Sequence, residues 1–224
     1  MCNRYVAPER AEIERFWDLR GELARTPWAR AIFPRAQGPF VRWRDGRREL
    51  AVGQWALIPH FATSPTLRYS TNNARSEDAA GKASYRLPWA RGQRCIIPAL
   101  SFDEPCWETG RNVWWRFRRA DGAPWGLAGL WNTWLDRQTG ELVESYTMLT
   151  INADAHPLMN RMHKPDPKLA PDQQDKRSVI AIERGEVDRW LAGGLDDASA
   201  LLRLTPAEAF DAGPADADTM ETPR

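Results

Sequence analysis

The segment Phe40-Val41-Arg42-Trp43-Arg44, the dipeptide Asp45-Gly46 and the segment Glu49–Ile58 together have the pattern of a β-hairpin. Two stretches of strand-forming residues flank a dipeptide that favours a tight turn. Asp-Gly suits turns whose two central residues have positive φ, and such turns match the twist of paired antiparallel strands. The sequence therefore predicts an antiparallel strand pair at this point of the chain.

Further short β segments follow, and turn signals separate them. They are Arg94–Pro98, Val113–Arg118, Trp125–Trp134, Tyr146–Ile151 and Ser178–Ile182. Two helices are expected: an amphipathic one over residues 8–25 and a short one over Glu186–Leu191. Because strands outnumber helices and do not alternate regularly with them, the pattern predicts an α+β fold. We expect a mostly antiparallel sheet, curled toward a barrel and flanked by helices.

Length and composition favour one soluble globular domain. The chain has 224 residues, with 42% hydrophobic and 27% charged residues. We expect a single domain over residues 1–205 and a disordered tail over residues 206–224, where Ala, Asp, Pro and Thr dominate. The segment Pro165–Asp175, rich in Pro, Asp, Lys and Gln, is expected to form an excursion loop.

The cysteines and the hydropathy pattern suggest where the protein resides. The three cysteines contain no C-x-x-C pair, and an odd count without a leader favours free thiols in a reducing compartment. The N-terminus has no apolar leader region, and no apolar stretch approaches the roughly 18 residues of a membrane span. We therefore expect a cytoplasmic protein without membrane association.

Basic residues are concentrated locally rather than over the whole chain. The net charge is +1, which excludes a basic field over the whole molecule. The chain also has 12 tryptophans, and a tryptophan ring can stack on an unpaired base. Arginines alternate with aromatic residues in Arg42-Trp43-Arg44 and in Trp114–Arg118. This pattern suits a groove that holds a nucleic-acid backbone and stacks unpaired bases. The alternative is a half-buried strand with a solvated basic face.

Cys2 follows the initiator methionine directly, in Met1-Cys2-Asn3-Arg4-Tyr5. A small second residue permits removal of Met1, which would leave a cysteine with a free α-amine and a thiol on adjacent carbons. Such an aminothiol condenses with an aldehyde to form an imine and then a five-membered thiazolidine. An α-amine has a pKa near ~8, so a useful fraction is nucleophilic at neutral pH. The alternative is that Cys2 is simply part of a frayed terminus.

The chain has only three histidines, His60, His156 and His163, each of which could transfer protons near neutral pH. His163 stands just before Pro165, where helix-like spacing stops, and such an end suits a side chain that projects into a cleft. His156 precedes Pro157 and has the pattern of a turn residue. Each histidine could equally be a surface or hydrogen-bonded structural group.

Two polar segments could complete a site. Glu104 lies among apolar neighbours, which would raise its pKa and let it deliver a proton near neutral pH; the alternative is a solvated loop carboxylate. In Asn72–Glu77, a side-chain amide could bind a substrate oxygen and Arg75 could grip phosphate, or the segment could be an Asx-type turn. Trp55, in Trp55–Pro59, could be a core residue.

Several common site types are missing from the sequence. There is no phosphate-binding loop, no dinucleotide-binding glycine motif and no G-x-S-x-G motif. The dispersed histidines and cysteines have no zinc-ligand spacing. We therefore expect neither a metal nor a cofactor.

Taken together, these segments resemble the SRAP family, the SOS-response-associated peptidases or abasic-site processing proteins. The resemblance runs in order over most of residues 1–195. The matching segments are Met1–Tyr5, Trp55–Pro59, Asn73–Glu77, Arg94–Pro98, Glu104, Ala128–Trp131, Leu149-Thr150, His163 and Lys176–Val179.

The resemblance implies a protein that binds single-stranded DNA and crosslinks to abasic sites through Cys2. By this resemblance Asn73 positions the amine or the opened sugar, Glu104 transfers protons and His163 assists sugar ring opening. It also implies a lyase side activity and a peptidase activity that removes Met1. DNA contacts are expected from Arg4, Trp55, Arg75, Arg116, Arg118 and Arg177.

The chain departs from the family pattern at three points. Asn3 replaces a frequent glycine, Pro105 replaces the tryptophan that usually follows the glutamate, and the Pro165–Asp175 insertion splits the family's histidine block. His156 is therefore the second candidate for the catalytic histidine. Two other functions stay open: a cysteine peptidase acting on proteins, and a non-catalytic module that binds single-stranded DNA. We expect a monomer.

Overall fold

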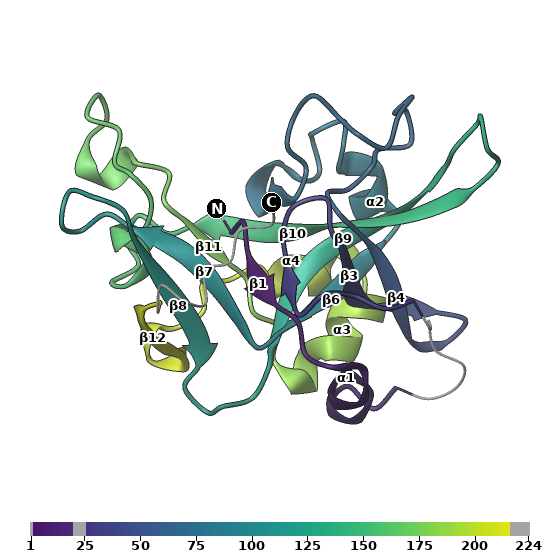
Figure 1. Cartoon of the computed structure of the whole chain (residues 1–224), viewed down its shortest axis with the longest axis horizontal. Coiled ribbons are helices and arrows are strands. Elements are labelled where there is room, and N and C mark those ends of the chain that lie inside the picture. The colour runs from purple at the N-terminus through teal and green to yellow at the C-terminus, as the bar shows by residue number, and fades with distance from the viewer. Residues whose placement is uncertain (1, 20–25, 216–224) are drawn as a thin grey trace.

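The computed structural model describes residues 2–19 and 26–215 of the chain, and its architecture is mostly β with a few short helices (Figure 1). The strands are β1 (Tyr5–Val6), β2 (Ala31–Ile32), β3 (Gln37–Arg44), β4 (Arg47–Trp55), β5 (Asn73–Arg75), β6 (Arg94–Ala99), β7 (Ser101–Cys106), β8 (Val113–Arg119), β9 (Trp125–Leu135), β10 (Leu142–Asn152), β11 (Arg177–Val179) and β12 (Phe210–Pro214). The α-helices are α1 (Arg10–Phe16), α2 (Arg86–Ala90), α3 (Val187–Ala192) and α4 (Leu195–Ala200).

The predicted hairpin is confirmed. Strands β3 and β4 pair antiparallel from Gln37↔Gln54 to Arg44↔Arg47. Asp45 and Gly46 form the turn with φ of 51° and 76°, the two positive values that this turn type requires. Glycine adopts such a φ without steric cost, and Asp is among the few other residues that tolerate it.

The hairpin belongs to a closed barrel of five strands, in the order β10–β4–β3–β6–β9. Strand β9 pairs with β10 again, which closes the ring. All of these pairings are antiparallel except the one between β10 and β4. The expectation of a mostly antiparallel, barrel-like sheet is therefore confirmed. The long β9–β10 hairpin extends beyond the barrel (Figure 1).

A second, antiparallel sheet has the strand order β12–β8–β7–β1–β2. In this sheet the N-terminal strand β1 lies between β7 and β2, with Tyr5 opposite both Phe102 and Ile32. The beginning of the chain is therefore held in the interior of a sheet, which differs from a frayed terminus.

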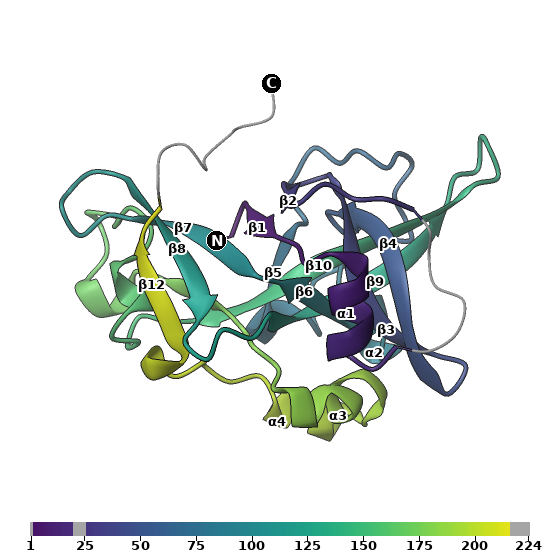
Figure 2. The same cartoon turned by 60° about the horizontal axis from the view of Figure 1, so that its bottom comes forward.

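Alternating side chains divide the apolar residues into two clusters. Along β3, Phe40 belongs to the cluster that joins the barrel to the second sheet, whereas Val41 belongs to a cluster on the opposite face. Ile96 of β6 lies in this second cluster with Trp17 and Trp190. Successive strand residues point to opposite faces, so one strand serves both clusters. Figure 2 shows α3 and α4 below the sheets and α1 in front of them, and residues of all three helices belong to the second cluster.

The N-terminal helix is shorter than expected. The prediction covered residues 8–25, but α1 spans Arg10–Phe16 and ends at Trp17. Asp18 then has a φ of 50°, a left-handed conformation that an α-helix cannot continue through. The remainder of the predicted helix, residues 20–25, lies outside the described residues.

The chain beyond residue 205 also differs from the expectation of a disordered tail. Residues Phe210–Pro214 form β12, which pairs with β8 from Phe210↔Arg119 to Pro214↔Trp115. Phe210 is buried and contacts Phe102, Phe117 and Trp125. Composition alone predicted disorder, but pairing with the edge of β8 and the burial of Phe210 order this segment. Residues 216–224 lie outside the described residues.

Within the described ranges, no helix is long and apolar enough to cross a membrane.

Candidate active site

Cys2 lies in the interior of the protein. Its side chain is fully buried, and its Sγ donates a hydrogen bond to the Arg4 carbonyl oxygen at 3.2 Å. The neighbouring chain is fixed because the Asp103 amide donates to the same carbonyl at 3.0 Å, which continues the β1–β7 pairing toward the N-terminus. A buried cysteine at the second position is thus placed by strand pairing.

Two consecutive asparagines hold the Cys2 backbone. The Asn73 side-chain amide donates to the Cys2 carbonyl oxygen at 2.7 Å, and that of Asn72 donates to it at 3.3 Å. Asn72 also donates to the Asn3 side chain at 3.2 Å. Asn73 opens β5, which pairs with β10 of the barrel, so a rigid sheet supports these amides. Side chains in and just before β5 therefore fix the orientation of the Cys2 backbone.

Glu104 and His163 lie within hydrogen-bond distance of each other. Glu104 lies on β7 and is only 1% exposed, and its Oε2 lies 3.1 Å from His163 Nε2. The imidazole is about a quarter exposed. A buried carboxylate is thus joined to a histidine that reaches the surface, which is a suitable arrangement for moving protons in and out.

His163 is placed by its backbone. Its amide donates to the Pro105 carbonyl at 2.6 Å, and its own carbonyl accepts a hydrogen bond from Lys176 Nζ, also at 2.6 Å. Lys176 also donates to the Met162 carbonyl at 2.8 Å. These contacts hold His163 at a φ of 61°, a left-handed conformation that is costly for a residue with a Cβ. Such a conformation persists because the surrounding bonds over-determine it.

Burial and charge set the protonation states at Cys2 and Glu104. Burial, and then the negative charge of Glu104, raise the pKa of the Cys2 thiol well above its ordinary value. Burial would also raise the pKa of Glu104, but the positive charges of the amino terminus and of His163 outweigh it. The pKa of Glu104 is therefore lowered. At neutral pH the site holds a neutral thiol beside an ionised carboxylate.

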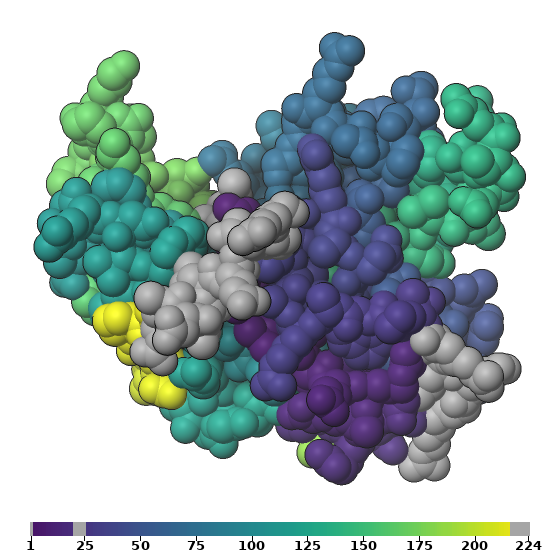
Figure 3. Space-filling view, in the orientation of Figure 1, coloured from purple at the N-terminus to yellow at the C-terminus, as the bar shows by residue number. Residues whose placement is uncertain are grey.

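Figure 3 shows the face on which the first described residues reach the surface. The purple surface of the first described residues lies near its centre, between the green surface of the chain around residues 155–175 and the blue surface of the chain around residues 60–85. A notch separates these two parts of the surface at the upper edge of the view. The segments that carry His163 and Asn73 thus border the N-terminal residues from opposite sides.

Comparison with known protein families identifies the family of this chain. The family model described as SOS response associated peptidase (SRAP) matches residues 1–220. The chain belongs to the SRAP family. The match extends beyond residue 205 and includes β12.

Two named relatives of this SRAP protein share about a third of its sequence in the aligned regions. "Abasic site processing protein HMCES" of Xenopus tropicalis is 29% identical over 165 residues, which cover 64% of this chain and 48% of the relative. "Abasic site processing protein YoqW" of Bacillus subtilis is 32% identical over 126 residues, which cover 55% of this chain and 54% of the relative. The alignments thus span about half the length of these relatives.

Solved structures share the SRAP fold described above. A crystal structure of a protein from Bordetella bronchiseptica is 34% identical, with a TM-score of 0.84, and the match covers 96% of this chain and 100% of that one. A protein from Bacteroides thetaiotaomicron has a TM-score of 0.80 at 21% identity, covering 97% of this chain and 93% of that one.

The two candidate histidines have different environments. His156 is buried, and its Nε2 lies 2.8 Å from the Thr205 carbonyl while its Nδ1 accepts the amides of Leu158 and Met159. Both ring nitrogens therefore serve the backbone, and the hydrogen bonds fix a neutral tautomer. His156 is a structural residue of this turn, whereas His163 is the histidine beside Glu104.

The predicted DNA-contact residues divide into two groups. Trp55 is fully buried and donates to the Asn72 carbonyl at 2.8 Å, so its ring offers no surface to a base. Arg177 is buried against Glu77, Asp175 and Thr150, where it joins β11 to its neighbours. These two residues differ from the expectation, because core packing and ion pairing occupy them.

Of the other four residues, Arg75 and Arg118 are exposed, Arg4 is partly exposed and Arg116 is buried. Arg75 is about half exposed and pairs with Asp175. Arg4 and the buried Arg116 both pair with Asp103, and Arg118 is exposed on the same strand as Arg116. The expectation that Arg116 and Arg118 share a face of β8 agrees with the cavity that both residues line.

Sequence reasoning assigned no role to three residues that organise the site: Asn72, Asp103 and Lys176. Asn72 is adjacent to Asn73, and strand alternation would place only one of two neighbours toward Cys2. However, Asn72 lies before β5, and strand alternation does not apply to it. Both asparagines can therefore donate to the Cys2 carbonyl. Lys176 follows the two carbonyls that it binds by 14 and 13 residues, and no local sequence signal predicts that contact.

Proposed function

We propose that this protein captures abasic sites in single-stranded DNA as a covalent thiazolidine on Cys2, after removal of Met1. The observation that carries the proposal is that Asn72 and Asn73 donate hydrogen bonds to the Cys2 carbonyl, while Glu104, which is paired with His163, is near enough to act electrostatically on the Cys2 thiol. The names of the relatives, abasic site processing proteins, support the same substrate.

The first steps form an imine. Hydrolysis of the Met1–Cys2 peptide bond consumes one water and releases methionine, leaving the Cys2 α-amine free. His163 accepts the hydroxyl proton at C1′ of the abasic sugar while the ring oxygen gains a proton, and the ring opens to an aldehyde. The amine then adds to the aldehyde carbon, and loss of one water gives the imine. Glu104 takes the proton that the amine loses and exchanges it with His163.

Ring closure completes the capture. The Cys2 sulfur forms a bond to the imine carbon, and the thiol proton moves to the nitrogen. The product is a thiazolidine, and the net change is the loss of one water from amine, thiol and aldehyde. In this scheme Asn73 fixes the Cys2 backbone so that amine and thiol approach the same carbon. If closure is slow, the imine permits β-elimination at the sugar, which is a lyase side reaction.

The electrostatics favour this scheme over a peptidase acting on other proteins. A cysteine peptidase activates its nucleophile by lowering the thiol pKa beside a histidine. Here burial and Glu104 raise the pKa of Cys2, and the nitrogen of His163 faces Glu104. A neutral thiol suits late addition to an imine, because the amine acts first.

The test is incubation of the purified protein with a single-stranded oligonucleotide that contains one abasic site, followed by a denaturing gel. We expect a heat-resistant adduct with the wild type. We expect the same adduct with the control variant Cys106→Ala, which replaces a different buried free cysteine. Cys2→Ala retains an exposable amine but no thiol. It should give an adduct only when borohydride reduces the imine.

Three results would overturn the proposal: no adduct with the wild type, the same heat-resistant adduct with Cys2→Ala, or retention of Met1 in the intact mass of the reactive protein. Equal binding of intact and abasic strands without any adduct would instead support a non-catalytic DNA-binding module.

A further inference from the structure

A cavity lined by five arginines lies on the other face of the β7 strand that carries Glu104. Its volume is about 550 Å³, and it is formed by β1, β8 and the chain before β2. Ser101 lines it, and Asp103 lies beneath it, bound to Arg4 and Arg116. Alternate residues of a strand point to opposite faces, so Asp103 serves this cavity while Glu104 serves Cys2. The arginines are Arg4, Arg30, Arg116, Arg118 and Arg119.

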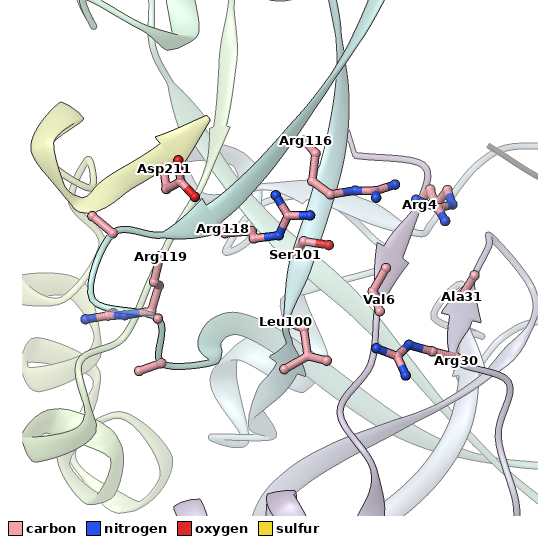
Figure 4. A pocket seen from close by; sticks show the side chains of 13 residues that line it. Arg4, Val6, Arg30, Ala31, Leu100, Ser101, Arg116, Arg118, Arg119 and Asp211 are labelled. Carbon is pink, nitrogen blue, oxygen red and sulfur yellow. The ribbon is translucent and has the colours of Figure 1, made fainter. Parts of the chain in front are cut away.

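The arginines differ in how their charge is balanced. Arg119 is neutralised by Asp121 and Glu183, and Figure 4 shows that its side chain points away from the others. Arg4 and Arg116 both pair with the carboxylate of Asp103. Arg116 is about nine-tenths buried, so water screens its charge poorly.

Two further arginines line the cavity and are exposed to solvent. Arg30 and Arg118 are exposed, and no ion pair to either occurs within residues 2–19 and 26–215. Figure 4 shows the Arg116 and Arg118 guanidinium groups directed from β8 toward β1, and that of Arg30 directed into the same opening from beside β2. Among residues 2–19 and 26–215, Asp211 is the one carboxylate that lines the cavity. The cavity therefore has a positive field with planar donors on two sides, which is suited to phosphate oxygens.

We propose that this cavity binds backbone phosphates of the captured DNA strand, beyond the abasic nucleotide. Arg4 connects the two places: it lines the cavity, and its carbonyl accepts the hydrogen bond of the Cys2 thiol. Two residues of extended chain span about 7 Å, so a strand tethered at Cys2 reaches Arg4 within one or two nucleotides. Arg30 and Arg118 would then hold the following phosphates.

This inference rests on the proposed substrate, but it can be tested without the covalent step. The probe is an intact single-stranded 15-mer, whose affinity is measured as a function of salt. Each phosphate contact of a single strand contributes about 0.7 to the slope of log K against log salt. We expect the double variant Arg30→Ala/Arg118→Ala to lower the slope by about 1.4 and the affinity at about 0.1 M salt on the order of 10-fold.

The matched control is Arg91→Ala/Arg137→Ala. It removes the same charge from two exposed arginines that do not line the cavity. It should leave the slope at the wild-type value. An equal fall in slope for both double variants, or no fall for either, would overturn the inference. Arg118→Gln, which keeps a long polar side chain on β8, should lower the slope by about 0.7.

Capture assays separate this inference from the proposed function. We expect Arg30→Ala/Arg118→Ala to slow adduct formation with an abasic 15-mer on the order of 10-fold at limiting DNA, and to leave capture of a trinucleotide with a central abasic site unchanged. An equal loss on both substrates would overturn the phosphate site. Absence of any wild-type adduct would instead count against the proposed function and would leave the salt measurement valid.

Discussion

Asp103 and Glu104 are neighbours on β7, and both are buried carboxylates, but they face different surroundings. Asp103 is clamped by two arginines on the cavity face, whereas Glu104 meets His163 beside Cys2. A carboxylate between two fixed guanidinium groups stabilises the sheet and organises charge. A carboxylate beside a titratable imidazole can exchange protons. Two neighbouring carboxylates of one strand thus have different partners, and the chemical role is proposed for Glu104 alone.

The largest expected effect is on catalysis, from Glu104→Gln. This substitution keeps the shape but removes the proton acceptor, and general acid–base catalysis contributes typically about 10²–10⁴-fold. We expect adduct formation to slow by that factor while DNA affinity stays at the wild-type level. Single-turnover gel assays measure the rate. A rate within twofold of the wild type would remove Glu104 from the reaction.

The same change one residue earlier should affect stability instead. Asp103→Asn removes the negative partner of Arg4 and Arg116, and breaking a buried ion pair from one side costs about 3–5 kcal/mol. We expect a fall in melting temperature on the order of 10 °C, measured by calorimetry. The capture rate below the transition should stay within several-fold of the wild type. If Asp103→Asn slowed capture as much as Glu104→Gln, the two faces would not be functionally distinct.

Lys176→Met tests the backbone support of His163. Lys176 binds the carbonyls of Met162 and His163, and the methionine would leave both without this donor. We expect the left-handed backbone at His163 to relax and adduct formation to slow about 10-fold, since misplacement by about 1 Å can cost up to 10²-fold. The control is Lys168→Met, an exposed lysine of the same loop, which should react at the wild-type rate.

The smallest expected effect is pH-dependent and lies away from both faces. Burial would raise the pKa of Glu77, but hydrogen bonds from Arg177 and from backbone amides lower it to about 2. The unfolded carboxyl titrates near ~4.3, so the unfolded chain binds more protons between these values. The stabilisation by Glu77 is therefore complete above about pH 4.5 and is lost as the pH falls toward 2.

Glu77→Gln should flatten the acid side of the stability curve. Because Glu77 is substantially exposed, solvent screening limits the contribution to about 1 kcal/mol. Urea unfolding of wild type and variant at several pH values between 2 and 6 measures the difference. A difference between the two curves that does not change over this range would contradict the assignment.

Local patterns in the sequence predicted most strands because those patterns depend on neighbouring residues. Asp45-Gly46 predicted its hairpin, and the apolar runs at β6, β9 and β10 predicted buried strands. Composition failed at β12, where a polar, Pro-containing segment is ordered by pairing with β8 and by Phe210. Pairing energy comes from the partner strand, and composition contains no information about the partner.

The chemical capacity of the protein is a property of its sequence. A cysteine placed second has an aminothiol once Met1 is removed, and few other residue orders provide one. The sequence also contained the carboxylate, the amide and the histidine that such chemistry needs. It ranked His163 before His156 without deciding between them, and it offered Trp55 both as a core residue and as a DNA contact. It did not show that Arg177 is enclosed.

The tertiary structure made those distinctions, for one physical reason. Proton transfer and charge balance act over a few ångströms, and the residues within that distance come from β1, β5, β7 and the loop before β11. Their separation along the chain is unrelated to their separation in space. Only the folded sheets placed Glu104 toward Cys2 and Asp103 toward the arginines, since the alternation of a strand decides which face a side chain occupies.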